Sequence, residues 1–445
     1  MRIAVIGGGL GGLAAARALV AAGHDPHVLE AKPRAGGVLG TTTTDGYVRE
    51  HAASSFLGSP TRGGRALCEQ LGVPVEKASP RAKRRWIFLD GKLRALPRNP
   101  LEVVRTDLLT WRGKLDLLRE PLRPPRSAGD ESVYSFAVRR FGAEAARAVV
   151  APFVTGIFAA DAHDVSLEAG FPRLADLDAG GGLVRGFAGQ TAKALFRRFA
   201  GGGKKHVQSG LFAPTGGLGA MVDALARELG PRVHLGRPVT QLAADERGVR
   251  VDGETWDAAV LAVPAEDAVK LVAPLPALAS RLRAFHRAPT QIVYLGYPEA
   301  AIPDAVDGFG FLVAQGEDLR VLGVVFESVV WPGRAPTGHV LLRCIFGGGR
   351  DPATAAFDDA TLIEHARRDV GVVLRASGTP THASVVRWTR GVAQYPVGHR
   401  DQVRLAVTAA RTHRIALAGA DYRGPGVNDL CADADVVVEE VRSWA

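Results

Sequence analysis

The stretch Met1-Arg-Ile-Ala-Val-Ile-Gly-Gly-Gly-Leu-Gly-Gly12 runs from a short apolar strand directly into a glycine turn. A glycine at position 7 permits the tight turn, one at position 9 lets the backbone approach a pyrophosphate, and one at position 12 lets a helix over about 10–22 pack on the strand. An acidic residue closes the next strand, where a carboxylate can accept hydrogen bonds from a ribose. This pattern predicts a Rossmann-type dinucleotide site whose ligand lies at the helix N-terminus. The expected cofactor contacts are Gly7, Gly9, Leu10, Gly12 and Glu30.

Two further glycine-rich segments favour FAD over NAD as the dinucleotide. Arg34, Gly36 and Gly37 form an Arg-x-Gly-Gly pattern just after the acidic residue. A flavin dinucleotide needs a second bare stretch of backbone along its diphosphate and ribityl chain, and an arginine supplies charge there. Near the end of the chain, residues 415–419 are typical of a buried strand that ends in glycine, and a final helix is expected over about 429–441. The cofactor contacts expected in this turn are Gly419, Gly426, Val427 and Asn428.

Several short motifs follow one another in a distinctive order along the chain. They are Gly7-x-Gly9-x-x-Gly12, Arg34-x-Gly36-Gly37, Gly46-Tyr47-x-x-Glu50, Arg84-Arg85-Trp86-Ile87-Phe88, Gly156-Ile157-Phe158-Ala159, Gly308-Phe309-Gly310-Phe311-Leu312-Val313, Gln394-Tyr395-x-x-Gly398-His399 and Tyr422-Arg423-Gly424-x-Gly426-Val427-Asn428-Asp429. In this order they resemble the oxygen-dependent protoporphyrinogen oxidases, a group of amine-oxidase-like flavoproteins. The resemblance covers nearly the whole chain. The chain departs from it where Ala52-Ala53 replaces Gly-Pro and where Ala160 replaces the glycine of Ala-Gly-Asp.

We predict an α/β (α+β) fold in three parts. The parts are a discontinuous Rossmann-type FAD-binding domain (residues 1–80, 205–265 and 400–445), a mixed-sheet substrate-binding domain (81–100 and 266–399) and an inserted helical domain (101–204). A hairpin is expected at 86–96, with its turn at Asp90-Gly91. Within the insertion, 101–122 and 192–199 have the pattern of helices with a basic face. A short strand is expected at 239–242, and the resemblance implies backbone contacts from Val239 to the adenine.

The resemblance implies a step of heme (tetrapyrrole) biosynthesis, the oxidation of protoporphyrinogen IX to protoporphyrin IX. A flavin removes six electrons in three two-electron steps and passes them to dioxygen, releasing hydrogen peroxide. No catalytic side chain beyond FAD is expected, and the carbonyl of Gly156 is implied to approach the reacting ring. Arg85 is the expected propionate anchor, because a planar guanidinium binds a carboxylate bidentately. The expected substrate contacts are Arg85, Phe309, Gly310, Leu312, Val325 and Ile345.

Three alternatives stay open at this point. Coproporphyrinogen III is the nearest rival substrate, and its additional propionates would need further cations, for which Lys83, Arg84 and Arg94 are available. A flavin amine oxidase or carotenoid desaturase would share the flavin frame without needing the Arg85 hairpin. A non-catalytic Rossmann-type escort protein would have lost its flavin. The electron acceptor and the oligomeric state, including a homodimer, are not decided by the sequence.

Composition and charge narrow the setting of the protein. The 445 residues are 47% hydrophobic, and Cys68, Cys344 and Cys431 lie far apart, which argues against disulfides and metal clusters and favours a reducing compartment. No signal peptide and no apolar run of about 18 residues is apparent, so a cytoplasmic protein without an integral anchor is expected. Residues 81–126 contain 13 Lys and Arg but five Asp and Glu. Because this basic block lacks a nucleic-acid motif, it favours an acidic small molecule or the peripheral face of an anionic membrane.

Overall fold

The computed structural model describes residues 1–59, 62–124, 126, 129–180, 210–245, 248–303 and 306–444. The chain forms two compact units. The first unit comprises Met1–Ala78, Val207–Arg287 and Arg400–Ala445, and the second comprises Ser79–His206 and Ala288–His399. The first unit therefore continues to Arg287, beyond the boundary predicted at residue 265. The division of the second unit into a sheet domain and a helical domain stays a prediction.

The first unit is built on a parallel sheet. Its elements are β1 (Arg2–Ile6), α1 (Leu10–Ala21), β2 (Asp25–Leu29), β3 (Thr41–Thr44), β4 (Tyr47–Glu50), β5 (Phe56–Leu57), α2 (Gly63–Gln70), β6 (Val75–Lys77), β9 (Leu211–Pro214), α11 (Leu218–Leu229), η4 (Gly230–Arg232), β10 (Val233–His234), β11 (Leu242–Asp245), β12 (Gly248–Val251), β13 (Glu254–Trp256), β14 (Ala258–Leu261), α12 (Ala265–Leu271), α13 (Pro276–Leu282), α16 (His399–Arg411), β20 (Ile415–Leu417) and α17 (Val427–Arg442). Five strands pair in the order β10-β2-β1-β14-β20, all parallel.

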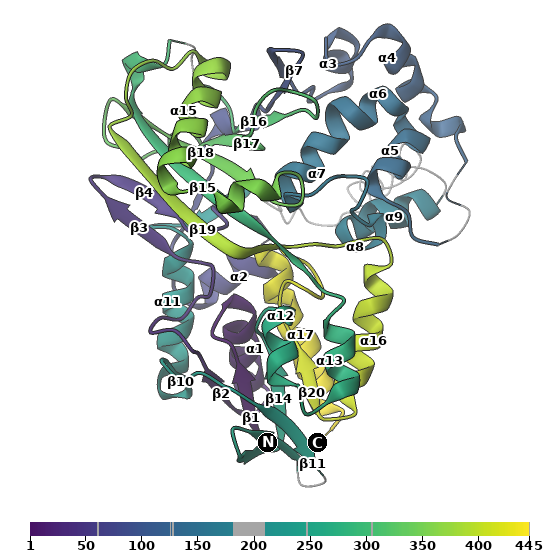
Figure 1. The fold of residues 1–445 in the computed structure, drawn as a ribbon, viewed down its shortest axis with the longest axis vertical. Coiled ribbons are helices and arrows are strands. Elements are labelled where there is room, and N and C mark those ends of the chain that lie inside the picture. The colour runs from purple at the N-terminus through teal and green to yellow at the C-terminus, as the bar shows by residue number, and fades with distance from the viewer. Residues whose placement is uncertain are drawn as a thin grey trace, which may run out of the picture. The chain divides into compact units, whose positions relative to one another are not determined.

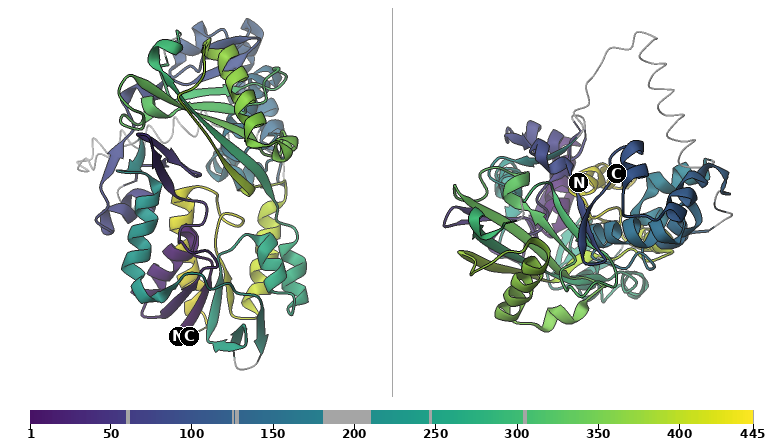
Figure 2. Two further views of the ribbon diagram at one scale, coloured as in Figure 1. Left: turned by 60° about the vertical axis from the view of Figure 1, so that its left-hand side comes forward. Right: turned by 90° about the horizontal axis from the view of Figure 1, so that it is seen from above.

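The central strands of this sheet lie in the hydrophobic core of the first unit. β1 and β14 are apolar and buried, as expected of parallel strands that are covered on both faces. One face packs against the β11-β12-β13 sheet and against α12, α13 and α16 in a single hydrophobic cluster (Figure 1). This packing is the reason that α12 and α13 belong to the first unit. Helix α1 packs against α11 and α17, and β1 begins at the same end of the unit at which α17 ends (Figure 2).

The second unit is built on a mixed sheet. Its elements are η1 (Pro80–Lys83), β7 (Trp86–Leu89), β8 (Lys92–Ala95), α3 (Pro100–Arg105), α4 (Trp111–Leu118), η2 (Glu120–Leu122), α5 (Val133–Phe141), α6 (Ala143–Ala145), the π-helix η3 (Ala146–Val150), α7 (Ala151–Phe158), α8 (Leu167–Gly170), α9 (Pro172–Ala179), β15 (Arg287–Pro298), η5 (Glu299–Ala301), β16 (Gly310–Val313), β17 (Gly323–Phe326), α14 (Glu327–Val330), β18 (His339–Gly347), η6 (Pro352–Ala356), α15 (Asp359–Leu374) and β19 (His382–Ala393). Seven strands pair in the order β19-β15-β18-β17-β16-β7-β8. β7 and β8 pair antiparallel, so the predicted 86–96 hairpin forms, and the parallel pairing of β7 with β16 joins it to the edge of the sheet.

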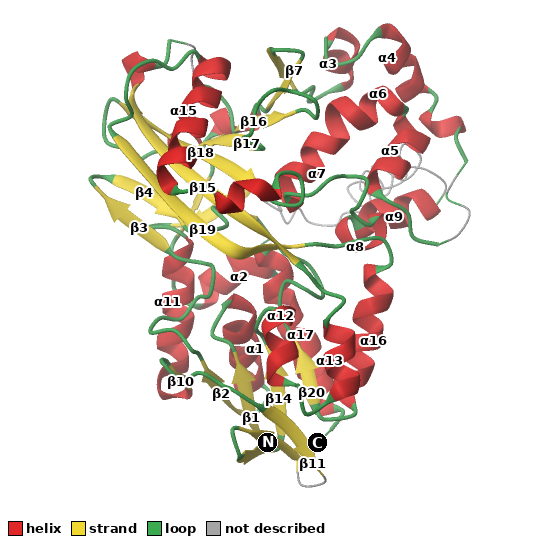
Figure 3. Ribbon diagram, viewed as in Figure 1, coloured by secondary structure: helices red, strands yellow, loops and turns green. Residues whose placement is uncertain are grey.

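Helix α15 packs on one face of this sheet (Figure 3). The strand residues in its hydrophobic cluster include Phe311, Val313, Val324, Phe326, Cys344 and Phe346. Because successive side chains of a strand point to opposite faces, the residues between them point away from α15. Leu312, Val325 and Ile345 therefore share the opposite face.

The segment 101–122, predicted from its pattern to be helical, forms three short helical elements, α3, α4 and η2, with a non-helical connection between α3 and α4. Thr106 is extended, which ends α3. Leu108 and Leu109 then enter a hydrophobic cluster, and the side chain of Thr110 caps α4 by accepting a hydrogen bond from the amide of Gly113. The connection between α3 and α4 thus buries two leucines, and this burial interrupts the helical periodicity of the segment. The basic helix predicted at 192–199 lies outside the described residues.

Two general properties of the described ranges bear on function. Within them, no helix is both long enough and apolar enough to cross a bilayer. The same ranges contain no group of three or more His, Cys, Asp or Glu side chains suited to hold a metal ion.

Candidate functional site

The turn between β1 and α1 has the backbone geometry that a dinucleotide site requires. Gly7 has φ +109° and donates its N–H to the carbonyl of Leu29 at 3.0 Å. A Cβ on Gly12 would collide with the carbonyl oxygen of Gly7, so helix and strand approach too closely for a side chain. A Cβ on Gly9 would instead meet only the Cα of Gly37, at 3.9 Å. Gly9 is therefore bare on a side that the protein leaves accessible.

Three glycine segments that are distant in sequence meet at the N-terminus of α1. Gly9 forms a parallel bridge with Gly36. A Cβ on Gly37 would lie 3.1 Å from the Cα of Gly9, and one on Gly11 would lie 3.4 Å from the Cα of Gly419. The result is a surface of bare backbone beside a helix N-terminus, and this is the cradle that the diphosphate of a dinucleotide fits.

Glu30 is buried beside this cradle. Its Oε2 accepts a hydrogen bond from the amide of Gly8 at 2.7 Å, and its Oε1 accepts one from the amide of Lys32 at 2.8 Å. The carboxylate is thereby held at the end of β2, where the sequence predicted it for a ribose.

Arg34 shapes the second glycine segment. Its guanidinium donates to the carbonyls of Ala35, Leu39 and Gly37 at 2.9 to 3.1 Å. These bonds fold the loop around Gly36. Arg34 was predicted from the sequence to supply positive charge near the diphosphate. In the structure its guanidinium also stabilises the loop that faces Gly9.

The C-terminal turn is fixed by buried charges. The amide of Gly419 donates to Oδ2 of Asp433 at 2.9 Å, and Arg423 donates to Oδ1 of the same carboxylate at 2.5 Å. Burial raises the pKa of Asp433, although Arg423 and the Gly419 amide oppose the shift. Sequence reasoning missed Asp433 because it lies within the final helix, where an acidic residue resembles ordinary helix surface.

The other predicted residues of this turn are mainly engaged with the protein itself. Asn428 accepts from the amide of Gly64 and donates to the carbonyl of Leu57, both at 2.9 Å, so its side chain joins α17 to α2 and β5. Val427 is buried. The amide of Gly426 donates to the carboxylate of Asp429 at 3.1 Å. Side-chain contacts from Asn428 to a cofactor would have to replace these bonds.

Val239 does not lie in a strand, which corrects the prediction for 239–242. Strand structure begins only at Leu242. Val239 packs against the first unit's hydrophobic cluster from an irregular segment. The carboxylate of Asp252 accepts hydrogen bonds from the amides of Thr240 and Gln241, both at 2.9 Å, and this occupies the backbone that a strand would have used for pairing.

In the second unit, the sheet face opposite α15 carries the predicted apolar substrate contacts. Leu312 and Ile345 lie on either side of Gly323 in one cross-strand row, and Val325 pairs with Gly310 in the neighbouring row. A Cβ on Gly310 would overlap the carbonyl of Val324, so the strands approach closely there. The structure thus brings Leu312, Val325 and Ile345 onto one surface.

Helix α7 borders this surface through Gly156. A Cβ on Gly156 would lie 2.6 Å from Cδ2 of Leu312, so glycine is needed for the contact. Phe153 and Ile157, one turn apart on the same helix, are 38% and 43% exposed. Neither residue is among the predicted substrate contacts, because the exposure of an apolar side chain in a helix depends on tertiary packing. Both apolar side chains are thus accessible on the helix whose Gly156 contacts Leu312.

Arg85 lies at the start of the hairpin, beside Phe309. Its guanidinium carbon is 5.2 Å from the ring centroid of Phe309, and the amide of Phe309 donates to the carbonyl of Arg84 at 2.7 Å. Among the described residues Arg85 forms no ion pair, whereas Arg84 pairs with Asp307 at 3.3 Å. Arg94 likewise pairs with Asp90, at 3.1 Å.

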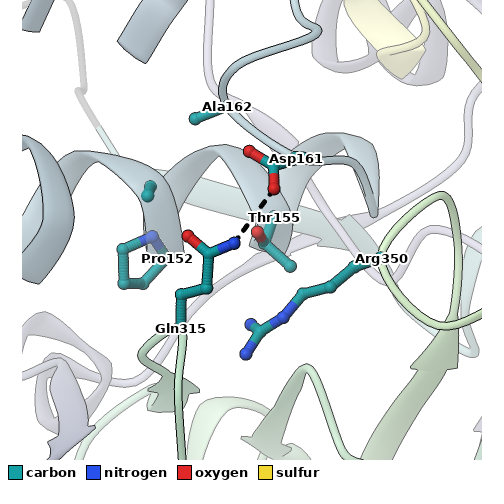
Figure 4. A pocket seen from close by; sticks show the side chains of 7 residues that line it. Pro152, Thr155, Asp161, Ala162, Gln315 and Arg350 are labelled. Carbon is teal, nitrogen blue, oxygen red and sulfur yellow. Dashed lines mark hydrogen bonds between the residues drawn. The ribbon is translucent and has the colours of Figure 1, made fainter.

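A small polar cluster holds the end of α7 against β16. The side-chain amide of Gln315 donates to Asp161 at 3.0 Å (Figure 4). Arg350 donates to the carbonyls of Val313 and Ala314. Burial tends to raise the pKa of Asp161, but hydrogen bonds from His163 and Gln315 lower it overall. The enclosed cavity of about 10 Å³ holds at most one water, so this cluster positions α7 and is too small for a substrate.

The loop after α7 contains one of the departures from the family pattern. Ala159 adopts the left-handed conformation with φ +48°, and its carbonyl accepts a hydrogen bond from the amide of Gly349 at 2.7 Å. Ala160 is buried, and its carbonyl accepts from the hydroxyl of Thr155 at 3.0 Å. The alanine at position 160 is therefore accommodated within a closed turn.

Comparison with known proteins assigns the chain to a class. Residues 10–429 match the family described as flavin containing amine oxidoreductase, and the chain belongs to this family. It is 31% identical to a coproporphyrinogen III oxidase of Propionibacterium freudenreichii, covering 99% of this chain and 90% of that protein. It is 29% identical to the chloroplastic protoporphyrinogen oxidase of Nicotiana tabacum, covering 99% and 85%. The predicted membership of the protoporphyrinogen oxidase family is confirmed.

Solved structures support the same fold. A crystal structure of a protein from Exiguobacterium sp. 255-15 has a TM-score of 0.81 at 22% identity and covers 100% of this chain and 99% of its own. A variant of putrescine oxidase has a TM-score of 0.69 at 18% identity, covering 100% and 99%. The mixed α/β fold predicted from the sequence is confirmed.

Proposed function

We propose that the protein is an FAD-dependent porphyrinogen oxidase with protoporphyrinogen IX as its substrate. The observation that carries the proposal is that the apolar face of Leu312, Val325 and Ile345 belongs to the same unit as Arg85, a cation without an ion-pair partner in the described chain. A porphyrinogen has this combination of properties, a broad apolar macrocycle and carboxylates at its edge. The names of the relatives favour the same substrate class.

The residues divide the task between cofactor and substrate. Gly9, Gly37 and Gly419 offer bare backbone to the FAD, with Glu30 placed for a ribose. When bound, FAD supplies a two-electron acceptor that three successive oxidations can use, with dioxygen removing the electrons as hydrogen peroxide. The second unit holds the macrocycle by its apolar face and by Arg85, and in this proposal no side chain changes covalently.

The experiment is an anaerobic titration of the purified yellow protein with protoporphyrinogen IX, followed by admission of air. We expect bleaching of the flavin absorbance, then its return together with one hydrogen peroxide per two electrons and the appearance of porphyrin fluorescence. Bleaching by primary amines or carotenoid precursors but not by porphyrinogens would replace the proposal with an amine oxidase or desaturase. A colourless protein that does not take up flavin would favour the escort reading.

A second candidate substrate is coproporphyrinogen III, which is favoured by the 31% identical relative. Its four propionates need more cations than the two of protoporphyrinogen IX. Of the three cations predicted for this task, Arg84 and Arg94 are engaged in ion pairs, which leaves Lys83. Comparing kcat/KM for the two porphyrinogens under identical conditions decides between them.

We also propose that the segment 101–122 binds peripherally to an anionic membrane surface at the cytoplasmic face. Trp111, Leu118 and Leu122 are 66%, 75% and 83% exposed, and the same segment carries Arg105 and Arg112, which form no ion pair among the described residues. Exposed apolar side chains interspersed with cations match the acyl and headgroup layers of an anionic bilayer.

Liposome flotation tests the membrane proposal. We expect binding to anionic vesicles that weakens with salt and is lost in the double variant Trp111→Ser/Leu118→Ser. The control is Leu235→Ser, which removes an exposed leucine of the first unit. Equal flotation of the two variants, or no flotation at low ionic strength, contradicts the proposal.

A further inference from the structure

A cavity of about 150 Å³ lies beside Arg85 in the second unit. It is lined by Ala82, Lys83, Arg85, Leu96 and Arg98. Three of its five lining residues are cations, and the other two are apolar. The cavity therefore has the composition of an anion site, three cations together with two apolar side chains.

The three cations differ in how their charge is compensated. Arg98 is bound to Glu102 through Nη2 at 3.0 Å, and its amide donates to the same carboxylate at 2.9 Å. In the described part of the chain, neither Lys83 nor Arg85 has a carboxylate within ion-pair distance. Two positive charges that share a cavity repel each other, so their pairing in one place favours a ligand with two negative charges.

Both cations are positioned by folded elements. Lys83 ends η1, whose start is capped by Ser79, which accepts a hydrogen bond from the amide of Arg81 at 3.3 Å. Arg85 is held between the ring of Phe309 and a backbone hydrogen bond from the amide of Leu96 to its carbonyl at 2.9 Å. These contacts fix the backbone positions from which the two exposed side chains extend.

We propose that Lys83 is a second carboxylate anchor, and that Lys83 and Arg85 together bind the two propionates on neighbouring pyrroles of the porphyrinogen. The identity of the ligand rests on the proposed function. Arg85 supplies the bidentate contact, and the more flexible ammonium of Lys83 takes the second carboxylate as a point charge. This assignment orients the macrocycle with its propionate edge toward the hairpin.

The role proposed for Lys83 predicts how its loss affects the two porphyrinogen substrates. Protoporphyrinogen IX and coproporphyrinogen III share the edge with two neighbouring propionates, and they differ at the opposite edge. Lys83 therefore acts on both substrates equally. If Lys83 instead served the additional propionates of coproporphyrinogen III, its loss would affect that substrate alone.

The test is steady-state kinetics of Lys83→Gln with both porphyrinogens, with Lys92→Gln as a control in β8 of the neighbouring hairpin. Lys92 is exposed and does not line the cavity. We expect KM to rise about tenfold for both substrates in Lys83→Gln, with kcat within about twofold and flavin content unchanged. Lys83→Arg should recover most of the affinity, because it keeps the charge.

A binding measurement makes the result independent of turnover. Quenching of porphyrin fluorescence gives Kd for coproporphyrin III and for its tetramethyl ester, and Lys83→Gln should weaken the free acid but not the ester. An unchanged KM and Kd in Lys83→Gln, or a change confined to coproporphyrinogen III kinetics, overturns the proposal. If the wild-type protein oxidises no porphyrinogen, the proposed function fails, whereas the acid-against-ester comparison still decides whether Lys83 binds carboxylates.

Discussion

Replacing Gly9 by valine should remove flavin binding and leave the fold intact. Gly9 has φ −72° and ψ 175°, which valine adopts readily, and a Cβ there would have 3.9 Å of clearance from Gly37. The side chain would therefore occupy the cradle without disturbing the protein. At a helix N-terminus the amides lack intrahelical partners and are available to a diphosphate. Loss of two such charge-assisted hydrogen bonds costs roughly 3–6 kcal/mol, or about 10²- to 10⁴-fold in affinity.

The assay is visible flavin absorbance per protein after desalting, combined with thermal unfolding of the flavin-free forms. Gly9→Val should have a Tm close to that of the flavin-free wild type, while Gly12→Ala should unfold at lower temperature because its Cβ would collide with the Gly7 carbonyl. Gly371→Ala is the control, since that glycine lies in α15 of the second unit and should keep its flavin. A folded Gly9→Val protein with full flavin occupancy would refute the assignment of the N-terminal turn.

Three further predictions concern the second unit. Arg85→Ala should raise KM about tenfold to a hundredfold with a smaller fall in kcat and unchanged flavin content, and Arg85→Lys should recover part of the loss; unaltered kinetic constants would rule out this anchor. Gly156→Ala should lower kcat/KM without loss of flavin, because its Cβ would lie 2.6 Å from Leu312; wild-type kinetics would show that Leu312 moves aside freely. Asp178→Ala should lower the free energy of unfolding by about 3–5 kcal/mol, as measured by denaturant titration, because the buried Arg140 would keep only its longer ion pair with Glu120, at 3.5 Å. Burial alone would raise the pKa of Asp178, but its arginine partners lower it overall, so its stabilisation is present at neutral pH and is lost as pH falls through the folded-state value; wild type should lose more stability than Asp178→Ala on acidification.

Features that depend on neighbouring residues were predictable from the sequence. The strand-to-helix turn at Gly7, the 86–96 hairpin and the final helix follow from apolar runs, glycines and turn residues within a few positions of each other. The hairpin is an instructive case, because Asp90-Gly91 both marks the turn and adopts positive φ, as such turns require. Local chemistry sufficed for these elements.

Features decided by distant partners were not predictable. The 101–122 segment has helical periodicity, but Leu108 and Leu109 pack into a hydrophobic cluster that includes Ile87 and Ala145. The helical structure is therefore interrupted between α3 and α4. Arg84 and Arg85 are adjacent and chemically identical, yet Asp307, more than 200 positions later, pairs with Arg84 and not with Arg85. Such distant partners cannot be identified from a single sequence. The sequence therefore indicates candidate cations but not which of them form ion pairs with distant carboxylates.

The strand order of the first unit has a consequence for biosynthesis of the protein. Ile6 pairs with Leu261, and Leu261 pairs with Leu417, so the sheet joins segments that lie more than 150 positions apart in the chain and leave the ribosome at different times. Contacts of such long sequence separation make folding slow. The nascent chain cannot complete the cradle at Gly9 and Gly11 until Gly419 has emerged. Flavin binding to the complete cradle is therefore expected only after Gly419 has left the ribosome.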